Sequence, residues 1–377
     1  MKLRHKILGA VGIVAAAGLV SLGLLVSHDS PCVPAPPVPA GATLMKAIVN
    51  RCYGSPDILT YENIARPVPG DNEILVRVHA ASVNPLDWHY MEGTPYVLRL
   101  EAGLGKPDNP RLGVDFAGTV EAVGRSVTRF KPGDEVFGGK RGAFAEYVLV
   151  PADRAIALKP HNVTFGQAAA VPIAGITALQ ALRDKGHVQA GQKVLINGAS
   201  GGVGTFAVQI AKALGAEVTG VCSTRNVDLV HSIGADHVID YTREDVTTGA
   251  DHYDVIVDNV STHSLLGYRR ILRPNGIYVM IGSATTGNWL GFLVKPVEGM
   301  VLSWFVSQKF GMMLAELDHQ DLAELGTLME SGKLMPVIDR QYPLRDAPAA
   351  LRYVEQGHAR GKVVLTVDSS VEARANP

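Results

Sequence analysis

Four glycines between a short apolar run and a periodic apolar segment are the residues with the clearest chemical meaning. Val194–Ile196 is typical of a buried strand, and the apolar residues of Val203–Leu214 recur at helical spacing. Bare backbone between them would let a pyrophosphate lie against the first turn of the helix, where the dipole favours an anion. This order predicts a dinucleotide site rather than a merely structural turn. The predicted contacts are Gly198, Ser200, Gly201, Gly202, Val203 and Gly204.

The residues that follow the next predicted strand, Glu217–Cys222, bear on which dinucleotide binds. A fold selective for NAD places Asp or Glu about 20 residues beyond the glycines, on the ribose hydroxyls. This chain has Ser223 and Arg225 there, and a hydroxyl and a guanidinium can bind a 2'-phosphate. NADPH is therefore predicted over NADH. The alternative is that Ser223 only caps the next helix while Arg225 is solvated.

Length, charge and cysteine content exclude several classes of protein. The chain has 377 residues, of which 47% are hydrophobic, so it can bury more than one core and is expected to form two domains. A formal net charge of -1 leaves no basic field, and no nucleic-acid partner is predicted. Three widely spaced cysteines predict neither a disulfide framework nor a cysteine-rich zinc site.

The N-terminal region carries a separate expectation. Ile7–Val26 is uncharged and about twenty residues long, enough to cross a bilayer as a helix. Residues 1–44 are therefore predicted to be a single-pass membrane anchor and a proline-rich linker, with a cleaved signal peptide or a buried helix as alternatives. The basic flank predicts that the catalytic part lies across the membrane, whereas NADPH chemistry favours the cytoplasmic side. We predict membrane localisation with the catalytic domain facing the cytoplasm.

The pattern along the rest of the chain divides it into two domains. Residues 45–164 show short alternating strands broken by Gly and Pro, which predicts a mainly β domain. Residues 165–305 alternate strands with helices, which predicts a doubly wound parallel sheet of the Rossmann type. Residues 306–368 are expected to return to the first domain and complete it, and 369–377 to form a tail. The predicted fold class is α/β.

Several separate phrases resemble the medium-chain dehydrogenases/reductases and, more narrowly, their zinc-free quinone oxidoreductase branch. The resemblance covers Met45–Val367 and implies a GroES-like β domain for the substrate, a Rossmann domain for the coenzyme, and a homodimer. The phrases that carry it are Ala81–Asp87, Gly113–Gly118, Phe130–Phe137 and Gly175–Leu179.

The resemblance also implies chemistry without zinc. Zinc-dependent members carry a Cys where this chain has Asn84, a His where it has Val114, and another Cys near Pro172 or Ile173, and these replacements supply no thiolate or imidazole. The twelve histidines are scattered, and we interpret them as surface or satisfied core residues. Without a Lewis acid, quinones and α,β-unsaturated carbonyls are better hydride acceptors than simple ketones, because they delocalise the incoming charge.

Further site residues come from the resemblance alone. Asn84 and Asp87 are expected near the nicotinamide, with a plain turn and a helix-capping Asp as alternatives. Tyr96, one residue out of step with a tyrosine of related enoyl reductases, is a candidate proton donor, and Tyr90 is a second. Further coenzyme contacts are expected from Thr177, Tyr241, Val260 and Gly282.

The predicted function is an NADPH-dependent, zinc-independent reductase of quinones or α,β-unsaturated carbonyls. Residues 285–314 are unusually apolar, which indicates a core or dimer-interface helix, or a lid over an apolar, lipid-derived substrate. Two alternatives stay open. One is an NADP-dependent alcohol dehydrogenase, and the other is a membrane-tethered NADPH-binding sensor or interaction protein without turnover.

Overall fold

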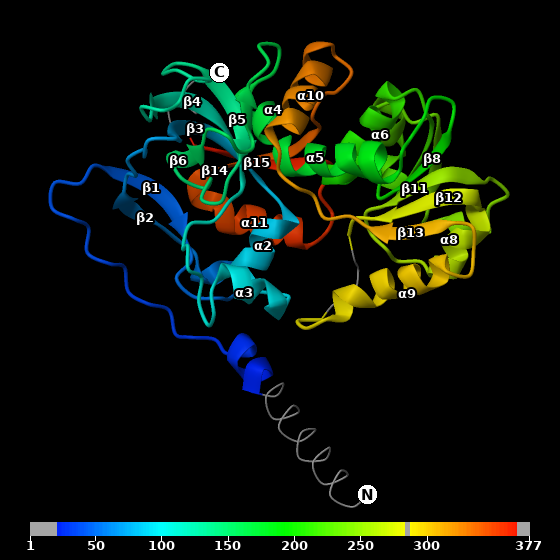
Figure 1. The fold of residues 1–377 in the computed structure, drawn as a ribbon, viewed down its shortest axis with the longest axis horizontal. Coiled ribbons are helices and arrows are strands. Elements are labelled where there is room, and N and C mark those ends of the chain that lie inside the picture. Colours follow the sequence, from blue (N-terminus) through cyan, green and yellow to red (C-terminus); the bar gives the residue numbers. More distant parts are fainter. Residues whose placement is uncertain (1–20, 283–286, 368–377) are drawn as a thin grey trace, which may run out of the picture.

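A computed structural model of the chain describes residues 21–282 and 287–367. Figure 1 shows a parallel sheet flanked by helices beside a mainly antiparallel β domain, with α5 (Pro172–Gln180) between them. The predicted combination of a Rossmann-type sheet and a GroES-like β domain is confirmed.

Repeated strand and helix units build a six-stranded parallel sheet in the order β10-β9-β8-β11-β12-β13. The order reverses between β8 and β11, so the connections that leave these two strands diverge and open a ligand position at their carboxyl ends. The strands are β8 (Lys193–Asn197), β9 (Glu217–Cys222), β10 (His237–Asp240), β11 (Tyr253–Asp258), β12 (Leu272–Met280) and β13 (Lys309–Met312). The helices are α6 (Gly202–Ala213), α7 (Val227–Ser232), α8 (Leu265–Ile271) and α9 (Val294–Ser303), with 3-10 turns η4 (Thr224–Asn226), η5 (Val246–Thr248) and η6 (Gly291–Leu293).

The β domain combines the first half of the chain with its last elements. Its main sheet has the order β14-β15-β3-β4-β5-β7, with β6 paired to β3, and β1 and β2 form a separate hairpin. The strands are β1 (Leu44–Val49), β2 (Thr60–Ala65), β3 (Glu73–Val83), β4 (Asp115–Val123), β5 (Glu135–Gly139), β6 (Tyr147–Pro151), β7 (Ile156–Leu158), β14 (Ile338–Pro343) and β15 (Lys362–Thr366). The helical elements are η1 (Pro56–Ile58), α2 (Pro85–Glu92), η2 (Tyr96–Leu98), α3 (Arg99–Ala102), α4 (Phe165–Ala169), α10 (His319–Glu330), η7 (Leu344–Asp346) and α11 (Ala347–Glu355).

The sixth parallel strand lies beyond the predicted end of the Rossmann domain. Residue 305 was the expected boundary, but β13 pairs in parallel with β12 and extends that sheet. A four-residue strand beside charged and polar residues gives little periodic signal, so the pattern alone did not identify it. Residues 309–312 therefore belong to the parallel sheet rather than to the β domain.

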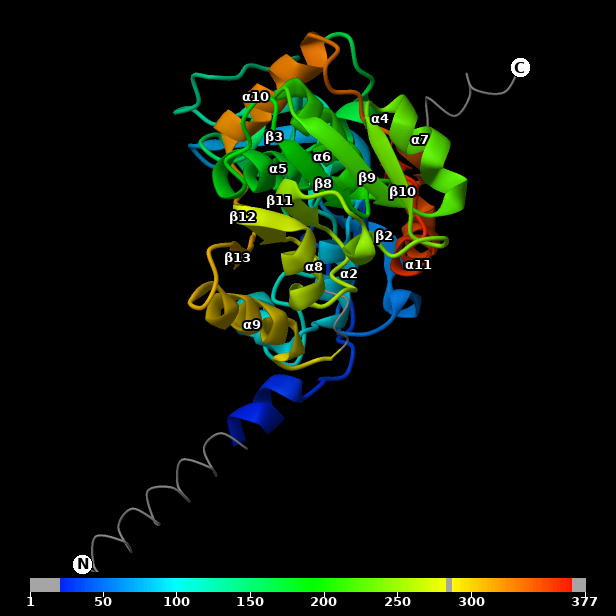
Figure 2. The same cartoon turned by 90° about the vertical axis from the view of Figure 1, so that its right-hand side faces the viewer.

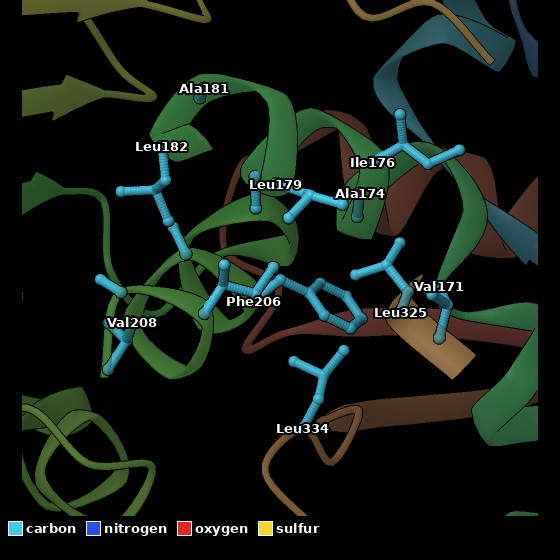
Figure 3. Close-up of a cluster of buried hydrophobic side chains, with 14 of the residues drawn as sticks. Val171, Ala174, Ile176, Leu179, Ala181, Leu182, Phe206, Val208, Leu325 and Leu334 are labelled. Carbon is cyan, nitrogen blue, oxygen red and sulfur yellow. The ribbon is translucent and has the colours of Figure 1, made fainter. Parts of the chain in front are cut away.

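A single buried cluster runs from the β domain into the parallel sheet. It joins Ala117 and Phe137 of the β domain through α5 to Phe206 of α6. Figure 3 shows Phe206 packed among side chains of α5 together with Leu325 and Leu334. Because interiors are close-packed and transmit displacement, this shared core holds the two sheets in a fixed relation.

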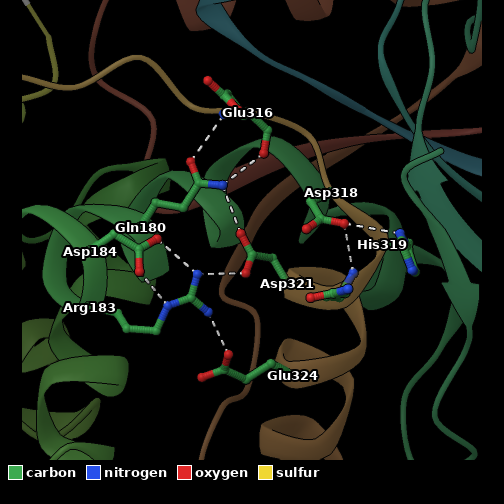
Figure 4. A network of polar contacts seen from close by, with 9 residues as sticks. Gln180, Arg183, Asp184, Glu316, Asp318, His319, Asp321 and Glu324 are labelled. Atoms are coloured by element: carbon green, nitrogen blue, oxygen red, sulfur yellow. Dashed lines mark hydrogen bonds and ion pairs between the residues drawn. The ribbon is translucent and has the colours of Figure 1, made fainter.

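A polar network fixes the far end of α5 against α10. The Arg183 guanidinium lies in the π-helical turn η3 (Ala181–Lys185) and reaches three carboxylates, those of Asp184, Asp321 and Glu324. Gln180 donates to Asp321 at 2.7 Å, and Figure 4 shows these side chains converging. Several charge-assisted bonds to one planar guanidinium set geometry better than a single exposed pair does.

The predicted membrane localisation is corrected by the structure. Over residues 21–282 and 287–367, no helix combines the length and apolar character needed to cross a membrane. Residues 21–27 are helical, but they end against the folded part of the chain, where Val26 is buried and its carbonyl accepts a bond from Arg99 at 3.2 Å. Residues 7–20 of the predicted span lie outside the described residues. A single-pass anchor with a cytoplasm-facing domain is therefore not assigned.

The chain just before the proline-rich linker is docked through Arg99. This side chain is 2% exposed; it pairs with Asp29 at 2.8 Å and donates to the carbonyls of His28 and Gly93. Its guanidinium also lies 4.4 Å from the ring centre of Tyr53. A buried guanidinium requires such partners, so it holds the linker and the α2–η2 region together.

A disulfide joins Cys32 to Cys52, which corrects the prediction that the cysteines form no such bond. The two residues are 20 positions apart, and Cys52 is buried at the start of the β domain. Spacing could not reveal this pair, because it is brought together by the docked linker.

We expect Cys32→Ser to lower stability by about 3 kcal/mol, since the bond restricts a loop of this length in the unfolded chain. Thermal unfolding followed by circular dichroism, with and without dithiothreitol, measures the effect. Wild-type protein should lose the same increment on reduction, and Cys52→Ser should match Cys32→Ser. An unchanged wild-type Tm on reduction would contradict the prediction.

Candidate active site

Two of the four glycines before α6 are required by packing of the turn itself. Gly198 has φ +76°, and a Cβ there would lie 2.7 Å from a methyl group of Val260. A Cβ on Gly204 would lie 2.1 Å from the carbonyl oxygen of Gly198. Any larger residue at either position must therefore displace backbone or the turn that follows β11.

The other two glycines leave the start of α6 open. A Cβ on Gly201, the N-cap residue, would meet nothing closer than 3.5 Å, and one on Gly202 would lie 3.3 Å from the Cδ of Lys362. The first N–H groups of a helix have no partner within it and favour an anion. Space for an approaching group and unpaired N–H groups are what the predicted pyrophosphate site needs, and the site itself stays a prediction. Ser200 and Val203 lie in this turn and its first helical residues.

A buried network at the ends of β8 and β11 shapes the neighbouring loop. Asn197 donates to Asp258 at 2.8 Å, and the same carboxylate accepts the backbone N–H groups of Val260 and Ser261. The Ser261 hydroxyl donates to the carbonyl of Gly282 at 2.5 Å. Val260 and Gly282 are thus held at the carboxyl edge near the glycine turn, by partners that the sequence pattern did not single out.

The residues predicted to select the coenzyme follow β9. Asn226 donates to the hydroxyls of Ser200 at 3.0 Å and Ser223 at 3.2 Å, which ties this region to the glycine turn. Arg225 is exposed and donates to the carbonyl of His358 at 2.8 Å. Tyr241, also exposed, donates its backbone N–H to Cys222. These residues share one edge of the sheet, and their contact with a coenzyme stays a prediction.

Asp240 is a nearby acid that sequence reasoning overlooked. Its carboxylate accepts the hydroxyls of Thr224 at 2.6 Å and Thr242 at 2.7 Å. Hydrogen bonding, led by the Thr224 hydroxyl, lowers the pKa of Asp240 and keeps it charged. An anionic group bound beside Arg225 would therefore also be repelled by the negative charge of the Asp240 carboxylate.

Asn84 lies in a buried polar cluster between the two sheets. Its Nδ2 donates to Asp115 at 2.9 Å, and its Oδ1 accepts from Lys362. Asp115 is fully buried and also accepts the Ser82 hydroxyl and the Ile173 backbone N–H, at 2.9 and 3.0 Å. The carboxamide therefore has a carboxylate at its nitrogen and an ammonium at its oxygen, which fixes its orientation.

Asp87 occupies the first turn of α2 and is fully buried. Its Oδ2 accepts the Asn84 backbone N–H at 2.7 Å, while its Oδ1 has no partner among the described residues. Burial is the main cause that raises the pKa of Asp87 to about 8. The cap that the sequence allowed as an alternative is present, and this carboxyl is neutral at pH 7. A direct catalytic role stays a prediction.

The positions at which zinc-dependent relatives carry ligands meet around Asp115. It directly follows Val114, and it contacts both Asn84 and Ile173. Within the described ranges, no group of three or more His, Cys, Asp or Glu side chains is placed to hold a metal ion. Instead, Lys362 Nζ lies 3.6 Å from Asp115 Oδ2. Zinc independence remains a prediction.

The remaining candidates have other neighbours. Thr177 is buried in α5 and donates its hydroxyl to the Ile173 carbonyl at 2.6 Å. Tyr90 stacks under the Arg141 guanidinium at 4.4 Å. Tyr96 packs edge-on against Trp289 at 5.0 Å. The structure therefore brings Asn84 and Asp87 together but gives Tyr96 a separate set of partners.

The described part of the apolar segment predicted as a core, interface or lid helix, residues 287–314, forms η6, α9, the turn after α9 and β13. Its outward side is unusually exposed, with Trp304 at 73% and Phe305 at 79%. Trp289 contacts Tyr96 on one side and lies against Gly23 on the other. Figures 1 and 2 show the loop before α9, rather than α9 itself, nearest the helix at residues 21–27. The α9 part of the segment is thus a surface element rather than a core helix, whereas β13 belongs to the parallel sheet.

Comparison with known proteins agrees with this architecture. Residues 70–160 match the alcohol dehydrogenase GroES-like domain family, and residues 233–365 match the family described as zinc-binding dehydrogenase. The mitochondrial NAD(P)H oxidoreductase RTN4IP1 of Mus musculus is 34% identical, over 87% of this chain and 90% of its own. The trans-enoyl reductase pgmF of Aspergillus terreus is 36% identical, over 80% and 88%. The quinone oxidoreductase structure from Coxiella burnetii is 31% identical with a TM-score of 0.76, over 86% and 100%.

The chain therefore belongs to the medium-chain dehydrogenase/reductase family, as the sequence motifs predict. Its relatives place it in the quinone oxidoreductase branch, and it is an oxidoreductase of that family with a nicotinamide coenzyme. The choice of coenzyme, the hydride acceptor and the homodimer remain predictions.

We expect Gly201→Ala to fold with a stability change within about 1 kcal/mol, because the added methyl has room, but to weaken NADPH binding at least tenfold (about 1.4 kcal/mol) by blocking the close approach. Coenzyme fluorescence titration measures Kd. Gly311→Ala, which also has open space, is the matched control and should bind normally. Gly204→Ala should fail to fold stably. Wild-type affinity in Gly201→Ala would exclude this turn as the phosphate site.

A second prediction concerns pH. Folded Asp87 has a pKa of about 8, against an ordinary value of 3.8, so between these values the unfolded chain has lost a proton that the folded chain keeps. The free energy of unfolding should therefore fall as pH rises across this window. The side chain of Asp87→Asn stays neutral at every pH. The Tm of this variant should therefore match that of wild type near pH 3.8 and exceed it near pH 8. Parallel Tm curves against pH would show that the Asp87 pKa is not raised.

Proposed function

We propose that the protein is an NADPH-dependent, zinc-independent reductase of quinones or α,β-unsaturated carbonyls. The observation that carries the proposal is the open turn at the start of α6, at the carboxyl edge where β8 and β11 diverge. Ser223 and Arg225 at the same edge favour a coenzyme with a 2'-phosphate.

The polar groups near Asn84 suit acceptors that need little charge neutralisation. When bound, a reduced nicotinamide supplies the hydride. Asn84, Val114 and Ile173 offer no thiolate or imidazole to bind a Lewis acid. Quinones and enones spread the incoming charge over a conjugated system, so hydrogen bonds and orientation suffice. The names of the relatives, quinone oxidoreductase and trans-enoyl reductase, support this choice.

The proton that follows the hydride can come from a tyrosine or from water. Tyr96 is half-buried beside Asn288 and Trp289, and it remains our first candidate. Its hydroxyl accepts only a long bond of 3.4 Å from Asn288 Nδ2, so its own proton is not committed by that contact.

The exposed apolar side of α9 supports an apolar acceptor. The Trp289 ring is in contact with the Tyr96 ring. An alkyl chain that extends past Tyr96 would therefore contact Trp289 and then the exposed apolar side chains of α9. Burying such a chain contributes about 0.8 kcal/mol per methylene. Long-chain acceptors should therefore have a lower KM than short ones.

NADPH oxidation followed at 340 nm across quinones, enals and enones of increasing chain length tests the proposed function. We expect turnover with quinones or enones and a KM that falls with chain length. Oxidation of alcohols with NADP+, without enone or quinone reduction, would replace the proposal with an alcohol dehydrogenase. Coenzyme binding without turnover on any acceptor would instead support a sensor.

Arg225→Ala tests the coenzyme preference. Loss of a charge-assisted bond to the 2'-phosphate should raise the Kd for NADPH about tenfold or more while leaving that for NADH unchanged. Arg243→Ala, which removes an exposed arginine paired with Asp240, is the control for a general change in surface charge. Equal effects of Arg225→Ala on both coenzymes would refute a 2'-phosphate contact.

A further inference from the structure

Lys362 is a buried lysine that none of the sequence motifs identified. It opens β15 and is 3% exposed, although it carries an ammonium group. Burying an ammonium costs free energy unless it is paired and hydrogen-bonded, so its surroundings have to supply partners. Those partners come from the Asn84 cluster, whereas the stem of Lys362 and the backbone beside it contact the glycine turn.

The backbone and stem of Lys362 lie against the glycine turn. The N–H of the preceding residue, Gly361, donates to the carbonyl of Ser200 at 2.9 Å. The Cδ of Lys362 lies 3.3 Å from the position that a Cβ on Gly202 would take. The lysine is therefore in contact with the turn that we assign to the coenzyme pyrophosphate.

The ammonium group points away from the turn and into the Asn84 cluster. It donates to Asn84 Oδ1 and to the Val83 carbonyl at 3.3 Å, and it lies 3.6 Å from Asp115 Oδ2. The ammonium group thus has two hydrogen-bond acceptors and one carboxylate in ion-pair contact. Asp115 in turn accepts the N–H of Ile173 in the first turn of α5.

We propose that Lys362 is a positioning residue that joins the coenzyme turn to Asn84. This inference rests on the proposed function and deepens it. The chain of contacts runs from Ser200 through Gly361 and Lys362 to the Asn84 carboxamide. The Lys362–Asp115 pair fixes the orientation of that carboxamide. The coenzyme turn and the Asn84 carboxamide are thereby held in a fixed relation. Removing the pair should slow hydride transfer while leaving coenzyme affinity nearly unchanged.

The test compares removal of the buried Lys362 ammonium group with removal of another buried ammonium group, that of Lys159. Lys362→Met alone leaves the Asp115 carboxylate buried and unpaired, so the informative variant is Lys362→Met with Asp115→Asn, which replaces the pair with neutral groups of similar size. Lys159→Met is the matched control, because Lys159 is also buried and donates to the Pro160 and Val163 carbonyls, but contacts neither the turn nor Asn84. Thermal unfolding confirms that each protein is folded.

For the double variant we expect an NADPH Kd within threefold of wild type, and a single-turnover rate of NADPH oxidation by a quinone at least tenfold lower. The KM for the quinone should change less than kcat. Lys159→Met should lower Tm without changing the rate per folded molecule. A folded double variant that transfers hydride at the wild-type rate overturns the inference.

A second readout does not depend on turnover, so it separates this inference from the proposed function. In protein labelled with 15N-asparagine, the Asn84 side-chain amide signals, assigned with Asn84→Ser, should shift on addition of NADPH. The shift should be absent in the double variant and present in Lys159→Met. Absence of the shift in wild-type protein, or its persistence in the double variant, overturns the inference even if no acceptor is reduced.

Discussion

The contact of Gly204 with the carbonyl of Gly198 is the constraint on which the coenzyme-binding end of the molecule depends. At 2.1 Å between that oxygen and the position of a missing Cβ, α6 can approach β8 only because the side chain is absent. This approach places the first turn of α6 at the carboxyl edge of the sheet, beside the loop that follows β11. The α6 helix then packs on α5 through Phe206, so the same contact also sets the distance to the β domain.

A second constraint is the burial of charge between the two sheets. Asp115, Asp87 and Lys362 are buried together near Asn84. Burial raises the pKa of both carboxyls and lowers the pKa of the lysine, while the attraction between Lys362 and Asp115 opposes these shifts. Such a cluster stabilises little by itself, because desolvation offsets most of the attraction. Its consequence is geometric, since each group has one arrangement in which its partners are satisfied.

The described part of the N-terminal segment makes tertiary contacts that its prediction as a membrane anchor and linker did not include. Its last helical turn contains Val26, whose carbonyl accepts a hydrogen bond from Arg99, and Cys32 further along is bonded to Cys52. Apolar length alone predicted a membrane span, whereas no helix within residues 21–282 and 287–367 is long and apolar enough to cross a membrane. The bonds from Arg99 to the carbonyls of Val26 and His28 join residues 73 and 71 positions apart, and no local pattern indicates them.

The sequence by itself determined the features that depend on local backbone preference and periodicity. These are the parallel strands β8 and β9, the glycine turn, the start of α6, and the motifs that place the chain in its family. Only the tertiary structure decided which distant groups meet: Lys362 and Asn84 are 278 positions apart, and β13 joins the sheet although its residues lack a strand pattern. Strand and helix signals repeat over a few residues, so they can be recognised in the sequence. A buried ion pair forms only after separate elements have packed, so no local sequence pattern indicates it.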